Sequence, residues 1–250
     1  MHKIKWTGKT WNVITGCKPI NPECVNCYAK AATKRLQSMA RKEFEKLYPK
    51  DSVLQFSDNG AIIGLRFNGE NRALYPQAKQ KLKYIQGWEK VAFHKESLQD
   101  ILDRKKYPSG SKVLVNSMSD TFQKDISGED LVELFDFMSK RQDLIFQIIT
   151  KNPTRLFHFL SWVFPNSKSG YLHKKMHKHI WFGVIVENQR QADIRINELL
   201  EIKEYINKEI KCFALIELMP SEIDLTPFTD ISNGLDFSIY TKCKDIKSEY

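Results

Sequence analysis

Short apolar segments rich in β-branched residues recur along this 250-residue chain, and they limit the folds open to it. Each has the length and composition of a strand that is buried on both faces of a sheet. Clear examples lie at residues 11–16, 90–94, 112–117, 145–150, 179–187 and 212–218, with a weaker one at 235–241. Strands of this kind belong mainly to parallel sheets covered by helices, so the segments predict an α/β fold.

Helix-like segments separate the later strands. Residues 152–164 open with Asn and Pro, which are favoured at a helix N-cap and first turn, and residues 188–206 form another such segment. Residues 127–141 follow a candidate cap, Ser127, with an apolar stripe of Leu131, Leu134, Phe135 and Met138. This alternation predicts parallel β/α units with right-handed crossovers. We expect an open or partial (β/α) barrel of about six to seven mostly parallel strands, with a doubly wound sheet as the alternative.

The length of the chain suits a single α/β domain, so we expect one domain over residues 1–250. The stretch 44–88 is less regular because glycine and proline interrupt its patterns, at Gly60, Gly64, Gly69 and Pro76. We interpret this stretch as an insertion after the first helix.

Composition narrows the class of protein. No run of about 18 apolar residues is present to cross a bilayer, and the first residues lack the apolar centre of a secretory signal. We therefore expect a soluble, cytoplasmic protein without a membrane partner. The net charge of +9 makes nucleic acid a candidate partner, although solvated lysine faces explain the charge more simply.

Three of the five cysteines, Cys17, Cys24 and Cys27, are gathered with the spacing C-x6-C-x2-C. The odd count, and the distance in sequence to Cys212 and Cys243, disfavour a disulfide framework and favour metal ligands. We expect Cys17 to follow the first strand and the C-x2-C pair to begin the first helix, where residues i and i+3 share a face. The sulfurs would then converge at the carboxyl ends of the strands, where β/α folds place their chemistry.

The identity of the metal is not fixed by the spacing. Structural zinc generally takes four protein ligands, whereas an iron-sulfur cluster held by three leaves one iron open to a cofactor such as S-adenosylmethionine. Three interpretations stay open at this point: a 4Fe-4S cluster, a zinc site completed by Cys212, Cys243 or a histidine, and three unrelated buried thiols.

Five blocks of sequence occur in a specific order: KIKWTGKTWNVITGC (3–17), CVNCYA (24–29), VLVNSMSDTF (113–122), FQIITKNPTRL (146–156) and WFGVIVENQRQADIRI (181–196). Together they resemble the phage-associated three-cysteine family, an uncharacterised group. The resemblance implies a partial barrel like that of radical S-adenosylmethionine enzymes, in which Cys17, Cys24 and Cys27 match the three cysteines of the family.

Two departures from the family pattern stand out. The segment LIELMPSEIDL (215–225) keeps Glu217 but changes its neighbours, and the sequence reaches CKDIKSEY (243–250) without the glycine-rich and aromatic segments of the family. These departures keep open a degenerate, non-catalytic member that acts as a platform for a partner.

Polar residues follow three successive predicted strands. Because strand ends in a barrel share one mouth, we expect a cofactor site lined by Asn116, Ser117, Asp120, Lys151, Glu187 and Asn188. Glu217, which the resemblance to the family singles out, is a further candidate for this site. Lys151 and Glu187 would contact the carboxylate and amino groups of the methionine moiety. Helix capping explains the Asn, Ser and Asp residues equally well.

The leading hypothesis is a radical S-adenosylmethionine-like iron-sulfur protein, in which an electron from the cluster generates a 5′-deoxyadenosyl radical that attacks an unknown substrate. A reductant protein would then be a further partner. The alternative from another class is a metal-stabilised nucleic-acid-binding protein. The sequence identifies no catalytic residue in either case.

Overall fold

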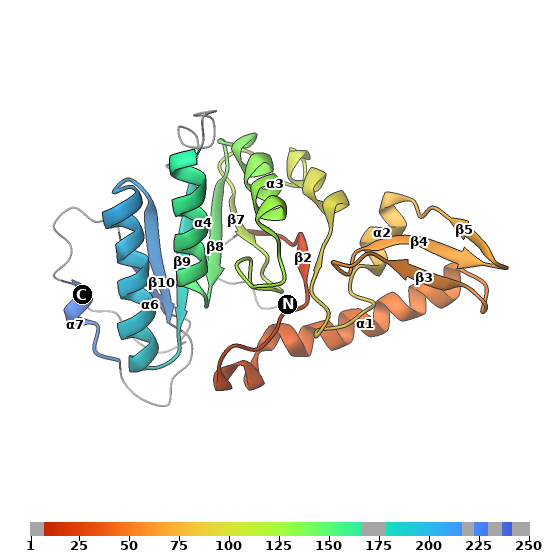
Figure 1. The fold of residues 1–250 in the computed structure, drawn as a ribbon, viewed down its shortest axis with the longest axis horizontal. Coiled ribbons are helices and arrows are strands. Elements are labelled where there is room, and N and C mark those ends of the chain that lie inside the picture. Colours follow the sequence, from red (N-terminus) through yellow and green to blue (C-terminus); the bar gives the residue numbers. More distant parts are fainter. Residues whose placement is uncertain (1–7, 167–178, 217–222, 230–236, 242–250) are drawn as a thin grey trace. The chain divides into compact units, whose positions relative to one another are not determined.

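The computed structural model describes residues 8–166, 179–216, 223–229 and 237–241 (Figure 1). The chain forms two compact units. Unit 1 consists of Met1–Gly8, Gly110–Leu114 and Gln142–Tyr250, and unit 2 consists of Lys9–Ser109 and Val115–Arg141. The chain therefore enters and leaves unit 1 more than once.

Unit 1 is built on a five-stranded parallel sheet. Its strands are adjacent in sequence order: β7 (Lys112–Val115), β8 (Ile145–Thr150), β9 (Ile180–Val186), β10 (Lys211–Ile216) and β11 (Phe237–Thr241). In β8 and β9, for example, Phe146 pairs with Ile180 and Thr150 with Val184. The prediction of a mixed α/β fold with parallel strands is thus confirmed.

Helices of unit 1 cover one face of this sheet (Figure 1). They are α4 (Pro153–Asn166) and α6 (Gln189–Glu201), the latter continued by a π-helical turn at Ile202–Ile206, while α7 (Thr226–Thr229) is a short additional helix. Alternate residues of β9, such as Phe182 and Val184, are buried, whereas Trp181 and Ile185, which point to the opposite face, are partly exposed. The sequence pattern of a strand buried on both faces is therefore only partly realised.

Unit 2 begins with short strands and one long helix. Its elements up to residue 47 are β1 (Lys9–Trp11), β2 (Ile14–Thr15), a 3₁₀ helix (Pro22–Asn26) and α1 (Tyr28–Leu47). The predicted strands 11–16 and 90–94 shrink to β2 and β6 (Ala92–Phe93), which pair antiparallel. The expectation that these two strands belong to a parallel sheet is therefore wrong. A side chain from another part of unit 2 forms hydrogen bonds with the backbone amides at this point, as described below.

The stretch 44–88 contains a small antiparallel sheet and a helix. The strands are β3 (Val53–Phe56), β4 (Ile62–Phe67) and β5 (Glu70–Arg72), and the helix is α2 (Pro76–Leu82). These elements enclose a separate hydrophobic core of Ile62, Leu65, Leu74 and Leu82, against which Phe44 of α1 packs. Figure 1 shows this sheet beside the second half of α1.

The rest of unit 2 includes a 3₁₀ helix at Lys95–Leu102 and α3 (Gly128–Ser139). The hydroxyl of Ser127 accepts a hydrogen bond from the Asp130 amide at 3.0 Å, which confirms the expected cap. The expected stripe of Leu131, Leu134, Phe135 and Met138 is buried.

None of the helices in the described part of the chain combines the length and apolar character that a bilayer span requires.

Candidate three-cysteine site

The backbone around Cys24 and Cys27 differs from the sequence prediction. Pro22 begins a 3₁₀ helix that ends at Asn26, and Cys27 is the extended N-cap residue of α1, with φ −63° and ψ 121°. The Cys27 amide donates to the Cys24 carbonyl at 3.3 Å. Because the backbone of Cys27 is extended and not helical, the shared α-helical face expected for the C-x2-C pair does not form.

The thiols of this segment are partly buried and form no disulfide. The Cys24 thiol donates to Oδ1 of Asn21 at 2.9 Å. Cys17 makes a long contact from its thiol to the Lys18 carbonyl, at 3.8 Å. Cys212, by contrast, is buried in β10 of unit 1, where its thiol contacts the Leu199 carbonyl.

Electrostatic interactions connect the three cysteines. The pKa of the Cys17 thiol is raised to about 12, mainly by burial and then by the charges of Asp120, Cys24 and Cys27, while a hydrogen bond from the Asp120 amide opposes the shift. All three sulfurs are therefore near enough for their charges to interact. In the described residues, however, no three Cys, His, Asp or Glu side chains are arranged to hold a metal ion. The sulfurs would have to turn toward a common point before they shared one.

Gly16 fixes the path of the chain into Cys17. Its φ of +75° is a conformation that favours glycine, and a Cβ there would lie 2.0 Å from the carbonyl oxygen of Lys90. The Cys17 amide donates to the Trp88 carbonyl at 2.9 Å. The backbone of Cys17 is thus held against the 88–90 segment.

The turn after β7 holds the other side of the same segment. Nε2 of Gln123 donates to the Gly16 carbonyl at 3.1 Å, and its Oε1 accepts from the Lys18 amide at 3.3 Å. Ser119 also donates to the Gly16 carbonyl. Gln123 was missed by sequence reasoning, since a single glutamine beyond a strand end carries no periodic or motif signal.

Asn116 has a structural role in unit 2. It is 2% exposed and has a φ of +55°. Its Oδ1 accepts from the amides of Val13 and Ile14 at 2.9 and 3.0 Å, and its Nδ2 donates to Thr121 at 3.0 Å. These bonds turn the chain between β1 and β2, which explains why the predicted strand 11–16 is interrupted.

Ser117 and Asp120 also make hydrogen bonds within unit 2, one to a distant part of the sequence and one within the turn. The Ser117 hydroxyl donates to Oδ1 of Asn12 at 3.1 Å, and Oδ1 of Asp120 accepts from the Phe122 amide at 2.8 Å. Neither contact caps a helix, so helix capping, the alternative that the sequence left open, does not account for Ser117 and Asp120. Asp120 is in addition close enough to affect the Cys17 thiol.

The strand-end residues of unit 1 form an ionic network. Nζ of Lys151 lies 2.6 Å from Oε1 of Glu187, and both side chains are largely buried. Arg195 lies 3.7 Å from the other carboxylate oxygen of Glu187, and it donates to the Ile185 carbonyl and to Gln191. Sequence reasoning selected Lys151 and Glu187 as contacts of a methionine moiety, whereas the structure pairs them with each other. It missed Arg195, whose position depends on the packing of α6.

Asn188 is the N-cap of α6, since its Oδ1 accepts from the Gln191 amide at 3.0 Å. Glu217 and Cys243 lie outside the described residues. The predicted cofactor site combines residues of both units. The expectation that their side chains line one cavity stays a prediction.

The family model "Protein of unknown function (DUF5131)" matches residues 1–239, and the chain belongs to that family. No curated protein and no solved structure is significantly similar to it. The description of the family assigns no activity, so function has to be argued from the residues themselves.

Proposed function

We propose that Cys17, Cys24 and Cys27 together bind a 4Fe-4S cluster with one iron left open, and that S-adenosylmethionine is the cofactor at that iron. The observation that carries the proposal is the gathering of three partly buried cysteines, none of them in a disulfide, within one short segment of unit 2. The other described cysteine, Cys212, is buried in unit 1 and hydrogen-bonded there. A three-ligand site is the arrangement that leaves an iron accessible.

The donor set suits such a cluster in its chemistry, because thiolates are the usual ligands of iron-sulfur centres. The backbone of Cys17 is fixed by Gly16 and Trp88, whereas Cys24 and Cys27 lie on a 3₁₀ helix and at a helix start. Side-chain rotation moves a cysteine sulfur without moving the backbone. Binding would therefore require the Cys24 thiol to give up its hydrogen bond to Asn21.

The chain contributes the ligands, their spacing and a partly buried environment. When bound, the cluster would supply the electron for reductive cleavage of the cofactor's sulfonium C–S bond. The backbone amide of Asp120 would face the Cys17 sulfur, where its hydrogen bond favours the thiolate. The same proposal carries the expectation that the sheet of unit 1 curves as part of an open (β/α) barrel.

Metal analysis after anaerobic purification and reconstitution with iron and sulfide tests the cluster. We expect about four iron and about four sulfide per chain, as a cluster of this type contains. Cys17→Ala, Cys24→Ala and Cys27→Ala should each lose most of both, while the matched variant Cys212→Ala keeps them. About one zinc per chain bound through the same cysteines would replace the iron-sulfur assignment with a zinc site. If the metal content does not depend on the cysteines, both the iron-sulfur and the zinc assignment are wrong.

A separate measurement tests the cofactor. Electron paramagnetic resonance of the reduced cluster should change when S-adenosylmethionine is added, because the open iron gains ligands. A complete cluster whose spectrum is unaffected would leave the metal site standing and contradict the cofactor assignment, which favours the non-catalytic platform.

A further inference from the structure

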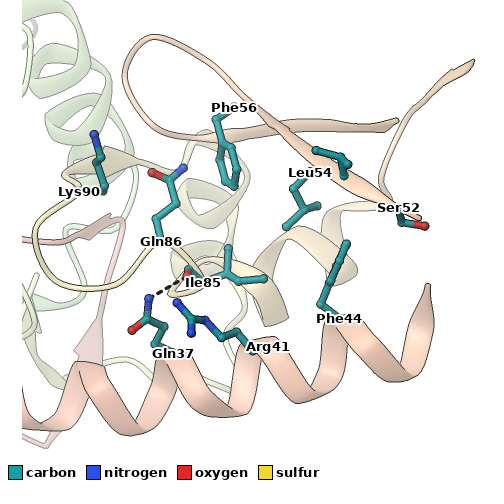
Figure 2. A pocket seen from close by; sticks show the side chains of 10 residues that line it. Gln37, Arg41, Phe44, Ser52, Leu54, Phe56, Ile85, Gln86 and Lys90 are labelled. Atoms are coloured by element: carbon teal, nitrogen blue, oxygen red, sulfur yellow. Dashed lines mark hydrogen bonds between the residues drawn. The ribbon is translucent and has the colours of Figure 1, made fainter. Parts of the chain in front are cut away.

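A cavity of about 520 Å³, widely open to solvent, lies within unit 2 between α1, β3 and the segment 85–90 (Figure 2). Its volume falls in the range of small-molecule sites in proteins. It is formed by the stretch 44–88, which the sequence shows only as an irregular insertion, together with the second half of α1. None of the three cysteines lines it.

Hydrogen bonds and glycines hold the walls of the cavity. Nε2 of Gln37 donates to the Ile85 carbonyl at 3.1 Å, and Nε2 of Gln86 donates to the Gly60 carbonyl at 2.8 Å. Gly87 has a φ of +84°, and a Cβ there would lie 2.7 Å from the side-chain Nε2 of Gln37. The positive φ of Gly87 favours glycine, and the hydrogen bond from Gln37 holds the 85–90 wall close to α1.

Apolar side chains form much of the cavity surface. Phe44, Leu54 and Ile85 pack on the core of the insertion and still line the hollow. Val53 and Phe56 also line it, and they are 61% and 39% exposed. Covering this surface with an apolar ligand would be favourable by about 25 cal/mol for each Å² removed from water.

The charges at the cavity are all positive. Arg41 and Lys90 line it, and no acidic residue does. Neither side chain has an ion-pair or hydrogen-bond partner among the described residues, whereas nearby Lys81 pairs with Glu43 at 2.7 Å. Figure 2 shows Arg41 extending from α1 toward Ile85, with Gln86 and Lys90 on the other wall and the Lys90 amino group directed away from Arg41. An anionic group would find cations here without displacing a carboxylate.

We propose that this cavity binds a small amphipathic anion. The flat apolar part of the ligand packs against Phe44, Leu54 and Phe56, and its carboxylate, phosphate or sulfonate group pairs with Arg41, while Lys90 on the other wall adds to the positive charge around the site. Arginine suits this role because its planar guanidinium forms two parallel hydrogen bonds to such groups. The inference does not depend on the metal site proposed above.

Two fluorescent probes of nearly the same shape test the proposal. The probe 1-anilinonaphthalene-8-sulfonate carries an anionic group, and N-phenyl-1-naphthylamine has the same ring system without it. We expect saturable binding of both to the folded chain, at one site. Arg41→Gln combined with Lys90→Gln should weaken the anionic probe about tenfold or more, since charge-assisted hydrogen bonds contribute about 1.5–3 kcal/mol. The neutral probe should be unaffected.

Matched variants separate the cavity from general surface charge. Arg35→Gln with Lys42→Gln removes two positive charges from the exposed surface of α1, outside the cavity lining, and should leave both affinities unchanged. Phe56→Ala should weaken both probes, whereas Tyr75→Ala, at an exposed residue elsewhere, should weaken neither. The proposal is overturned if no saturable binding occurs, if the Arg35 and Lys42 variant weakens the anionic probe equally, or if the Arg41 and Lys90 variant has no effect on it.

Discussion

The turn after β7 in unit 2 and the ends of β8 and β9 in unit 1 have the same signature in the sequence, yet they are built differently. At the turn, Asn116 uses its neutral amide to satisfy the backbone amides of Val13 and Ile14. At the strand ends of unit 1, Lys151 and Glu187 satisfy each other by charge. Polar residues after an apolar run thus predict where the chain needs hydrogen bonds, and not whether those bonds serve the backbone or other side chains.

The difference has an energetic side. A buried amide that loses its acceptor has no replacement, so the full cost of desolvation appears in the free energy of unfolding. In a buried ion pair, by contrast, the attraction between the two charges offsets little more than the free-energy cost of removing both from water. We therefore expect the neutral turn to be more sensitive to substitution, and the ionic network to tolerate removal of both partners together.

The largest effect should come from Asn116→Ala. It leaves the buried amides of Val13 and Ile14 without an acceptor and places alanine at a positive φ, for a combined loss of about 4 kcal/mol in the free energy of unfolding. Urea denaturation measures the loss. Asn116→Asp keeps the acceptor oxygen and should cost less. A loss below about 1 kcal/mol for the alanine variant would show that other groups satisfy these amides.

Glu187→Gln should rank second. It leaves the largely buried Lys151 without its counter-charge, and we expect a loss of about 3 kcal/mol. The double variant Lys151→Met with Glu187→Leu should be more stable than the single variant, because Arg195 keeps its bonds to Ile185 and Gln191. If the double variant is the less stable of the two, the ionic network resembles the neutral turn and the contrast fails.

The stability of the folded chain should depend on pH through His94 of unit 2. Burial lowers the pKa of His94, with contributions from Lys83 in the same direction and from Glu96 in the opposite one. A lowered pKa means that the unfolded chain binds the proton first, so stability is complete above the unfolded pKa of about 6.5 and falls below it.

The expected slope is at most about 1.4 kcal/mol per pH unit, and it approaches this limit only between the folded and the unfolded pKa. Urea midpoints between pH 7.5 and 5.5 test it, with His94→Gln as the variant in which this contribution is lost. Equal slopes in both proteins would contradict a neutral, buried His94.

The smallest effects should come from the helix caps, one from each region. Ser127→Ala and Asn188→Ala should each cost about 1 kcal/mol, as N-cap removal usually does. Asn188→Ser, which keeps a capping oxygen, should restore most of the loss. If Asn188→Ala leaves stability unchanged, the side chain is available for another role, such as the cofactor contact that the sequence suggested.

Regular elements with strong patterns were predictable. The strand 145–150 and the stripe of α3 agree with the structure, because burial and period alone determine them. The sheet at residues 53–72 was not predicted, since Gly60 and Gly64 interrupt its alternation while the tertiary core of Ile62 and Leu65 stabilises it.

The residues of the candidate site stay a prediction, and their backbone geometry differs from what the sequence indicated. The spacing of the cysteines indicated their proximity, but the 3₁₀ helix at Pro22–Asn26 and the extended Cys27 follow from local backbone choices that no pattern encodes. Arg195 and Gln123 act through partners far away in the sequence. Such partners become visible only when the fold brings them together.

The interleaving of the two units has a consequence for how the chain is made. The segment Gly110–Leu114, most of β7, leaves the ribosome before the residues of α3, which belong to unit 2, and before its sheet neighbour β8. The parallel sheet therefore cannot begin to pair until much of the other unit has been synthesised. A polypeptide that started at Gln142 would lack β7 and would leave one edge of β8 open to pairing with other molecules. Neither unit can be separated from the other by a single cut in the gene.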